Sequence, residues 1–259
     1  MMGDYVQLGG VRTWYDERGE GEPLGLLHGG VVDTRFFDQN IDPLAERFHV
    51  YAVDLRGHGH TADVEGPFTY DAFAQDTIEF LETVVGGPAH LVGHSVGAAV
   101  SMFVTLRRPD LVRKLVMVSS GFHHHAAIGS GGEIDVEPVV AAFGESYGAV
   151  SPDGQDHYPV VVRKVLEMGA REPELDASDL SGITNRTLVM CGDDDIITLE
   201  HTIDMYRAIP NSELAIVPGT SHFVLQEKAA ACNAIIIDFL ANDPVPTVAP
   251  VRRAPDASS

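Results

Sequence analysis

Residues 89–103 constrain the fold of this chain more than any other stretch. A short apolar run leads into the pentapeptide Gly93–Gly97 (GHSVG), and small and apolar residues at helical spacing follow it. This pattern predicts a strand, a sharp turn and a helix, with Ser95 at the turn. A glycine two residues before Ser95 and another two residues after it let the strand and the helix approach without clashes between Cβ atoms. Ser95 is therefore our candidate nucleophile.

Length and charge restrict the class of protein. The 259 residues fit one α/β domain, or a core with one insertion. The formal net charge of −21 argues against nucleic acid or an anionic membrane as a partner, because either polyanion would be repelled. The sequence shows neither a signal peptide nor a membrane span, and Cys191 and Cys232 are expected to be small buried residues rather than a disulfide. We expect a cytoplasmic monomer or homodimer that binds a small-molecule substrate.

Strands and helices alternate along most of the chain, which predicts a mostly parallel, doubly wound sheet. A β-hairpin around Gly9-Gly10 opens the sheet, and Pro43 is expected to bend or interrupt the first helix. The expected strands span residues 24–27, 48–54, 89–92, 112–119, 187–191 and 213–217, and the expected helices span 33–46, 70–85, the segment after Ser95, 199–209 and 224–240.

The alternation stops between residues 122 and 182, which are therefore a candidate insertion into a core formed by residues 1–121 and 183–241. The insertion contains a glycine-rich loop at 128–132, and its apolar spacing predicts helices at 136–147 and 160–168. Residues 242–259 are rich in proline, alanine and small polar residues, so we expect a disordered tail.

A serine hydroxyl needs a general base, and the base needs an acid to orient it. Residues 192–195 (GDDD) follow one late strand and Ser221-His222 follow the last one, in the order expected after a serine of this kind. Near the other end of the chain, His28-Gly29-Gly30 follows an early strand. Consecutive glycines there can turn backbone N–H groups toward an oxyanion, although the tripeptide alone also fits a plain glycine-rich turn.

In these motifs, and in residues 54–59 (DLRGHG), the chain resembles the α/β-hydrolase-fold enzymes of the broad esterase, lactonase and C–C hydrolase group. The resemblance covers nearly all of residues 4–241. It implies an α/β-hydrolase fold in which residues 122–182 form a helical lid over Ser95. It also implies a catalytic triad of Ser95, Asp195 and His222, and an oxyanion hole made by the backbone N–H groups of Gly30 and Val96.

Several residues near these motifs are assigned roles from their type and position. In the family the acid usually lies three residues after the glycine, so Asp193 and Asp194 are interpreted as turn and helix-capping residues. Residues 123–125 (HHH) are interpreted as a loop at the lid entrance and not as a metal site, because neighbouring side chains diverge on a regular backbone. The residues expected to line the substrate pocket are Gly29, Phe36, His94, Phe122 and Phe143, of which His94 is better explained by a structural role.

The resemblance predicts acyl transfer through Ser95, with hydrolysis of an ester or lactone of a small, fairly apolar carboxylic acid and without a metal or organic cofactor. Hydrolysis of a C–C bond and cofactor-free perhydrolysis use the same triad and are the alternatives. Because no aspartate stands at the nucleophile position, dehalogenase and epoxide hydrolase chemistry are disfavoured. A small-molecule receptor with a slow triad is a more distant alternative, which exposed apolar lid residues would indicate.

Overall fold

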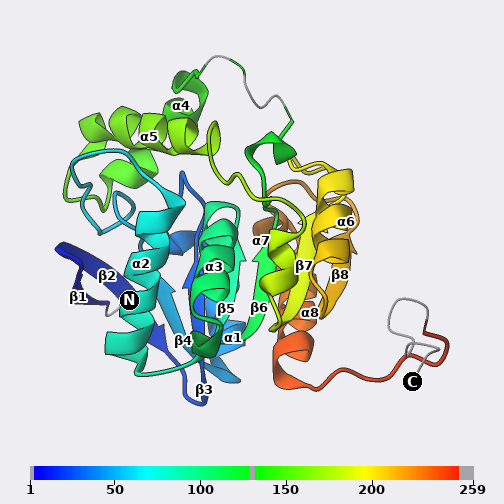
Figure 1. Cartoon of the computed structure of the whole chain (residues 1–259). Coiled ribbons are helices and arrows are strands. Elements are labelled where there is room, and N and C mark those ends of the chain that lie inside the picture. The colour runs from blue at the N-terminus through cyan, green and yellow to red at the C-terminus, as the bar shows by residue number, and fades with distance from the viewer. Residues whose placement is uncertain (1–2, 129–131, 133, 251–259) are drawn as a thin grey trace.

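The structure is a computed structural model that describes residues 3–128, 132 and 134–250. An eight-stranded sheet forms its centre (Figure 1). The pairs β1–β2 and β2–β4 are antiparallel and every other pair is parallel, as the sequence predicts. In spatial order the strands are β1 (Asp4–Leu8), β2 (Val11–Arg18), β4 (Phe48–Val53), β3 (Glu22–Leu27), β5 (Ala89–His94), β6 (Val112–Val118), β7 (Arg186–Gly192) and β8 (Ser212–Val217).

Helices cover both faces of the sheet, which explains why its central strands read as continuous apolar runs. One apolar core joins the sheet to α2 (Tyr70–Phe80), α3 (Val96–Arg107) and α6 (Leu199–Ala208). A second core joins the opposite face to α1 (Ile41–Ala45) and α8 (Ala229–Ala241). This arrangement is the doubly wound α/β architecture, and Figure 1 shows its two helical layers.

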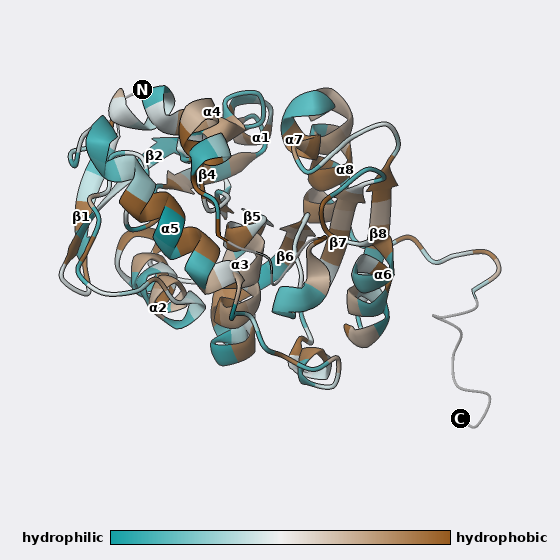
Figure 2. Cartoon of the chain, turned by 90° about the horizontal axis from the view of Figure 1, so that it is seen from above, coloured by the Kyte–Doolittle hydropathy of each residue, from teal (hydrophilic) through white to brown (hydrophobic). Residues whose placement is uncertain are grey.

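Helices α4 (Glu137–Gly148) and α5 (Tyr158–Gly169) lie above one edge of the sheet, at the top of Figure 1. Both were predicted within two residues at each end. Helix α5 alternates between apolar and polar residues (Figure 2), and its buried residues Val161, Val162, Val165 and Met168 follow the spacing of one helical face. The glycine-rich loop predicted at 128–132 lies largely outside the described residues.

The predicted helix at 33–46 is wrong as a single element. A 3-10 helix covers Thr34–Phe37, and α1 begins only at Ile41. The interruption comes before Pro43, which lies in the first turn of α1, where a missing N–H breaks no helical hydrogen bond. The buried amide of Asn40 instead donates to the Leu225 carbonyl and the Asn233 side chain, so contacts with a distant segment determine where the chain leaves helical geometry.

The predicted helix at 224–240 is also divided. Helix α7 (Val224–Glu227) ends before Lys228, whose φ of −134° and ψ of 50° are not helical, and α8 follows directly. The ammonium of Lys228 bonds the Pro218 carbonyl, in the loop that follows β8. Residues 242–250 are exposed and contain no helix or strand, whereas 251–259 lie outside the described residues.

Cys191 and Cys232 are both buried and free, as expected. In the part of the chain that the structure describes, no helix combines the length and the apolar character that crossing a bilayer requires.

Candidate active site

Ser95 lies at the sharp turn between β5 and α3, as the sequence predicts. Its φ of 52° and ψ of −116° are strained for a residue with a side chain, and its N–H donates to the Val118 carbonyl at 2.9 Å. The flanking glycines are required by close approach, because a Cβ on Gly97 would overlap the backbone of Leu27 and one on Gly93 would overlap Gly97. The turn therefore holds the Ser95 hydroxyl at the carboxyl end of the sheet.

The structure brings Ser95, His222 and Asp195 into one hydrogen-bonded chain. His222 Nε2 accepts from Ser95 Oγ at 3.0 Å, and His222 Nδ1 donates to Asp195 Oδ1 at 2.8 Å. Ser95 follows β5, Asp195 follows β7 and His222 follows β8, so three strand ends of one sheet position the three groups. In this arrangement the nitrogen that faces the serine is free to accept its proton.

The Asp195 carboxylate is fully buried, while His222 keeps 13% of its side chain exposed. Burial alone raises the pKa of Asp195, but the hydrogen bond and charge of His222 outweigh it. The Ser119 hydroxyl and the N–H of Ile197 act in the same direction, so the pKa of Asp195 lies below its ordinary value. An ionised Asp195 stabilises the positive charge that His222 acquires when it takes a proton.

The loops that carry Asp195 and His222 are tied to each other. Asp193 Oδ1 accepts from the Thr220 N–H at 3.1 Å, and the Asp194 N–H donates to the Thr220 carbonyl at 3.0 Å. The turn role predicted for these two aspartates fits, but the capping role does not. Thr198 caps α6, because its hydroxyl accepts from the third backbone N–H of the helix.

Gly30 and Val96 lie side by side next to Ser95. A Cβ on Gly30 would overlap the Val96 side chain, and Val96 is the first residue of α3, whose N–H has no partner within the helix. His28 Nδ1 donates to the Gly29 carbonyl at 2.7 Å, and His28 Nε2 accepts from the Leu55 N–H at 3.0 Å. Because the C=O and N–H of a trans peptide point in opposite directions, His28 fixes the orientation of the Gly30 N–H.

His94 contacts the backbone of His222 and positions it. Its Nε2 donates to the backbone carbonyl of His222 at 2.8 Å, and its ring stacks on Phe36 at a centroid distance of 4.3 Å. Burial lowers the pKa of His94 to about 3, and the nearby His222 acts in the same direction. A neutral ring held on both sides keeps the backbone of His222 in place, which agrees with the structural role predicted for His94.

A cavity of about 420 Å³ opens at Ser95 and His222. Its described walls include the ends of β5 and β6, one side of α5, and the segments around residues 119–135 and 196–197. The five residues predicted to line the pocket are not among the described residues of these walls. Phe36 and Phe143 line a separate cavity of about 180 Å³, Phe122 stacks on His201, and Gly29 and His94 pack beneath the serine.

Ser119 is a site residue that the sequence analysis missed. It directly follows β6, has a φ of 54°, is 1% exposed, and lines the cavity. Its hydroxyl makes no hydrogen bond of normal geometry, yet it lies close enough to Asp195 to lower the pKa of that carboxyl. Its position at the end of a buried parallel strand, like that of Ser95, was the available signal.

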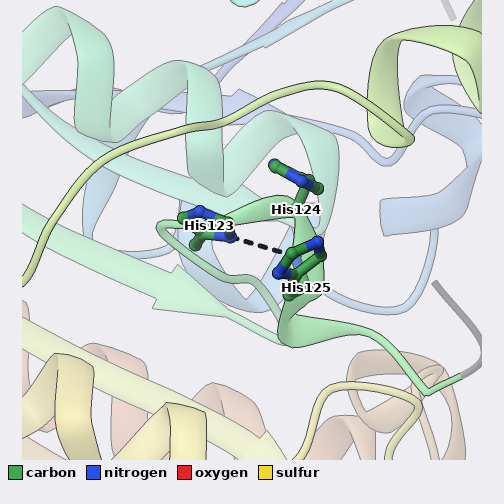
Figure 3. A group of neighbouring side chains, drawn as sticks. All are labelled: His123, His124 and His125. Carbon is green, nitrogen blue, oxygen red and sulfur yellow. Dashed lines mark hydrogen bonds between the residues drawn. The ribbon is translucent and has the colours of Figure 1, made fainter. Parts of the chain in front are cut away.

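The three histidines at 123–125 cluster, contrary to the expectation that they diverge. A 3-10 turn, His124–Ala126, gathers their rings so that their nitrogens lie within 4.8 Å of one another (Figure 3). His123 Nδ1 accepts from the His125 N–H, and His124 Nδ1 donates to the Pro173 carbonyl. Ligand nitrogens of a tetrahedral zinc ion lie about 3.3 Å apart. The cluster would therefore have to contract to hold an ion.

From two buried histidines we predict how the free energy of unfolding depends on pH. Burial lowers the pKa of His28 to about 4 and that of His94 to about 3, from an ordinary value of 6.5. Between about pH 6.5 and 4 the unfolded chain binds protons that the folded chain does not, so the free energy of unfolding falls as the pH falls. Each histidine contributes up to about 1.4 kcal/mol per pH unit.

Urea denaturation between pH 8 and pH 4 measures this slope. His94→Gln is expected to flatten it, whereas the same substitution of the exposed His125 is expected to leave it unchanged. A slope that is the same in His94→Gln as in the unsubstituted protein would show that His94 does not titrate in this way.

An eight-stranded, mostly parallel sheet with a serine held at the turn after β5 defines an α/β hydrolase. Residues 26–235 match the alpha/beta hydrolase family, and the chain belongs to that family.

Several relatives are known as hydrolases. The chain is 28% identical to (E)-2-((N-methylformamido)methylene)succinate hydrolase of Acinetobacter baylyi over 86% of this chain and 92% of that enzyme. The structure of Est816, described as an N-acyl homoserine lactone degrading enzyme, matches with a TM-score of 0.76 and 25% identity, over 91% of this chain and 100% of Est816. The CarC enzyme, a serine hydrolase involved in carbazole degradation, shares the fold with a TM-score of 0.77 and 24% identity, over 93% and 98% of the two chains.

Proposed function

We propose that this protein is a serine hydrolase that cleaves an ester or lactone of a small, fairly apolar carboxylic acid. The observation that carries the proposal is the chain of hydrogen bonds from Asp195 through His222 to Ser95, which opens into the cavity. In the proposed reaction, His222 takes the proton of Ser95 while the hydroxyl oxygen attacks the substrate carbonyl. The backbone N–H groups of Gly30 and Val96 stabilise the oxyanion.

His222 then gives its proton to the leaving alkoxide, and the acyl group stays on Ser95. A water molecule, activated by the same imidazole, releases the acid and restores the serine. The ionised Asp195 keeps His222 in the orientation and tautomer that both steps need. Every proton in this sequence moves through His222, so no further acid or base is required.

The size and lining of the cavity favour a substrate with a small and apolar acyl group. Its volume of about 420 Å³ is in the lower part of the range of small-molecule sites, which span roughly 300–1,000 Å³. The apolar residues in its described walls include Val96, Ala126, Ala127, Ile128, Ile134, Val165, Leu166, Ala170, Pro173, Ile196 and Ile197. Because Val165 and Leu166 belong to α5, we also propose that residues 122–182 act as the lid of this site.

Hydrolysis of p-nitrophenyl acetate, butyrate and octanoate, together with γ-butyrolactone, tests the proposal. We expect turnover of at least one ester, with acetate or butyrate preferred over octanoate because of the size of the cavity. Est816 supports the inclusion of a lactone, since it is described as a lactone-degrading enzyme. Hydrolysis of none of these compounds would contradict the proposal and favour C–C bond hydrolysis instead.

A further inference from the structure

The described walls of the cavity at Ser95 contain acidic residues but neither lysine nor arginine. Asp135 and Glu172 line it, and neither a lysine nor an arginine does so among the residues that the structure places there. The sequence extends this finding to the undescribed residues of the same segment. Between Lys114 and Arg163 the chain has six aspartates and glutamates and not one lysine or arginine.

Three basic residues belong to α5 and its end. Arg163 is exposed and does not line the cavity. Lys164 Nζ donates to both carboxylate oxygens of Asp63, at 2.8 and 2.7 Å, and to the Val64 carbonyl at 2.7 Å. Arg171 is exposed, and its Nε donates to the Glu167 carbonyl at 3.0 Å. None of these three side chains lines the cavity, so none supplies it with a positive charge.

Glu172 is fixed in the wall of the cavity. Its Oε2 accepts from the N–H of Tyr70 at 3.0 Å, and Tyr70 is the first residue of α2. The positive end of a helix favours a carboxylate at this place. The negative charge of Glu172 is therefore held beside the space that a substrate would occupy.

Besides the proposed base His222, two imidazoles line the cavity, and they offer little to an anion. His124 Nδ1 donates to the Pro173 carbonyl, so a neutral ring presents only an acceptor at Nε2. His123 Nδ1 accepts from the His125 N–H, so a neutral ring presents a single donor at Nε2. One neutral donor is much weaker than the paired charged donors of a guanidinium.

We propose that this site selects substrates whose acyl part is uncharged or carries an ammonium group, and discriminates against acyl parts that carry a carboxylate. The inference rests on the proposed function, because it concerns the substrate of the same site. A substrate carboxylate would lose its water beside Asp135 and Glu172 without gaining a charged partner, which is costly. An ammonium group would gain the attraction of both.

Three esters with the same trans-enoyl core test this inference: p-nitrophenyl crotonate, mono-p-nitrophenyl fumarate, which is close to it in shape, and the larger p-nitrophenyl 4-(trimethylammonio)crotonate. Their trans double bond prevents the carboxylate of the fumarate ester from attacking its own ester group. Each kcat/KM is divided by the rate constant of hydroxide-catalysed hydrolysis at high ionic strength, where the charge of the ester affects its reaction with hydroxide least, to correct for differences in intrinsic reactivity. The assay is run at pH 8 and low ionic strength, where charges are least screened.

We expect the normalised kcat/KM of the fumarate ester to be at least tenfold below that of the crotonate ester, or about 1.4 kcal/mol. The trimethylammonio ester is expected to equal or exceed the crotonate ester. The double variant Asp135→Asn, Glu172→Gln is expected to reduce the ratio between crotonate and fumarate at least threefold. Glu46→Gln, at the opposite end of the sheet before β4, removes one negative charge far from the cavity and is expected to leave the ratio unchanged.

The outcomes separate this inference from the proposed function. Hydrolysis of the crotonate ester together with an equal or faster reaction of the fumarate ester would overturn the inference and leave the proposed function standing. Calorimetric binding of crotonanilide and fumaranilic acid gives a second readout that needs no turnover. Tighter binding of the acid would overturn the inference, and binding of neither anilide without hydrolysis of any ester would overturn both proposals.

Discussion

Replacing Ser95 by alanine is expected to lower kcat for p-nitrophenyl butyrate by about 10⁵-fold. The variant loses the only atom that forms the acyl-enzyme in the proposed mechanism, and loss of a nucleophile of this kind commonly costs that much. The residual rate would come from the oxyanion hole and from substrate binding. Initial rates at saturating substrate measure the effect, and circular dichroism and thermal unfolding show whether the variant is folded.

Ser101→Ala is the matched control for this prediction. Ser101 lies on the same helix, α3, and is fully buried, and its hydroxyl donates to the backbone carbonyl of Gly97. It is expected to retain activity within about threefold, because a helical serine-to-alanine change leaves the cavity intact. If Ser95→Ala kept more than a tenth of the activity, the assignment of the nucleophile would be wrong.

Replacing Gly97 by alanine is expected to have the largest effect on stability, a loss of about 3 kcal/mol or more in the free energy of unfolding. The added Cβ would overlap the carbonyl groups of Leu27 and His28. Backbone atoms of a central strand cannot move aside as a flexible side chain does, so β3 and α3 would have to separate. Urea denaturation at pH 7.5 measures the loss, and kcat is expected to fall as well because α3 carries Val96.

Gly169→Ala is the control for Gly97→Ala. Gly169 ends α5, and a Cβ there would meet nothing within 4 Å. Alanine is favoured over glycine in a helix by about 0.5–1 kcal/mol, so this variant is expected to be equally or slightly more stable. An equal stability of Gly97→Ala and the unsubstituted protein would mean that the strand and helix do not approach as closely as the structure shows.

Local sequence patterns were sufficient to predict most of the sheet and the turn at Ser95. The turn depends on the glycines two residues before and two residues after Ser95. A parallel strand that is buried on both faces appears in the sequence as a continuous apolar run. The order of Ser95, Asp195 and His222 along the chain also came from motifs at strand ends. Their contacts could not be derived in that way, because His222 lies 127 residues from Ser95 and only the sheet brings them together.

Other features depended on partners that are distant in sequence. The helix expected at 33–46 breaks where Asn40 bonds Leu225 and Asn233, and no local pattern reveals those bonds. The residues predicted for the pocket are absent from its described walls for a similar reason. Apolar side chains such as Phe36 and Phe143 look alike in the sequence whether they face the cavity at Ser95 or a second one beside it.

The sequence by itself therefore determined which segments form strands, where the serine turn lies, and that the insertion is acidic. Those properties follow from short-range sterics, from apolar runs and from counts of charge. The tertiary structure alone decided that Ser119 lies against Asp195, that His94 holds the backbone of His222, and which side chains surround the cavity. Such contacts depend on how loops from separate strands meet at one edge of the sheet, and that geometry is set by packing across the whole molecule.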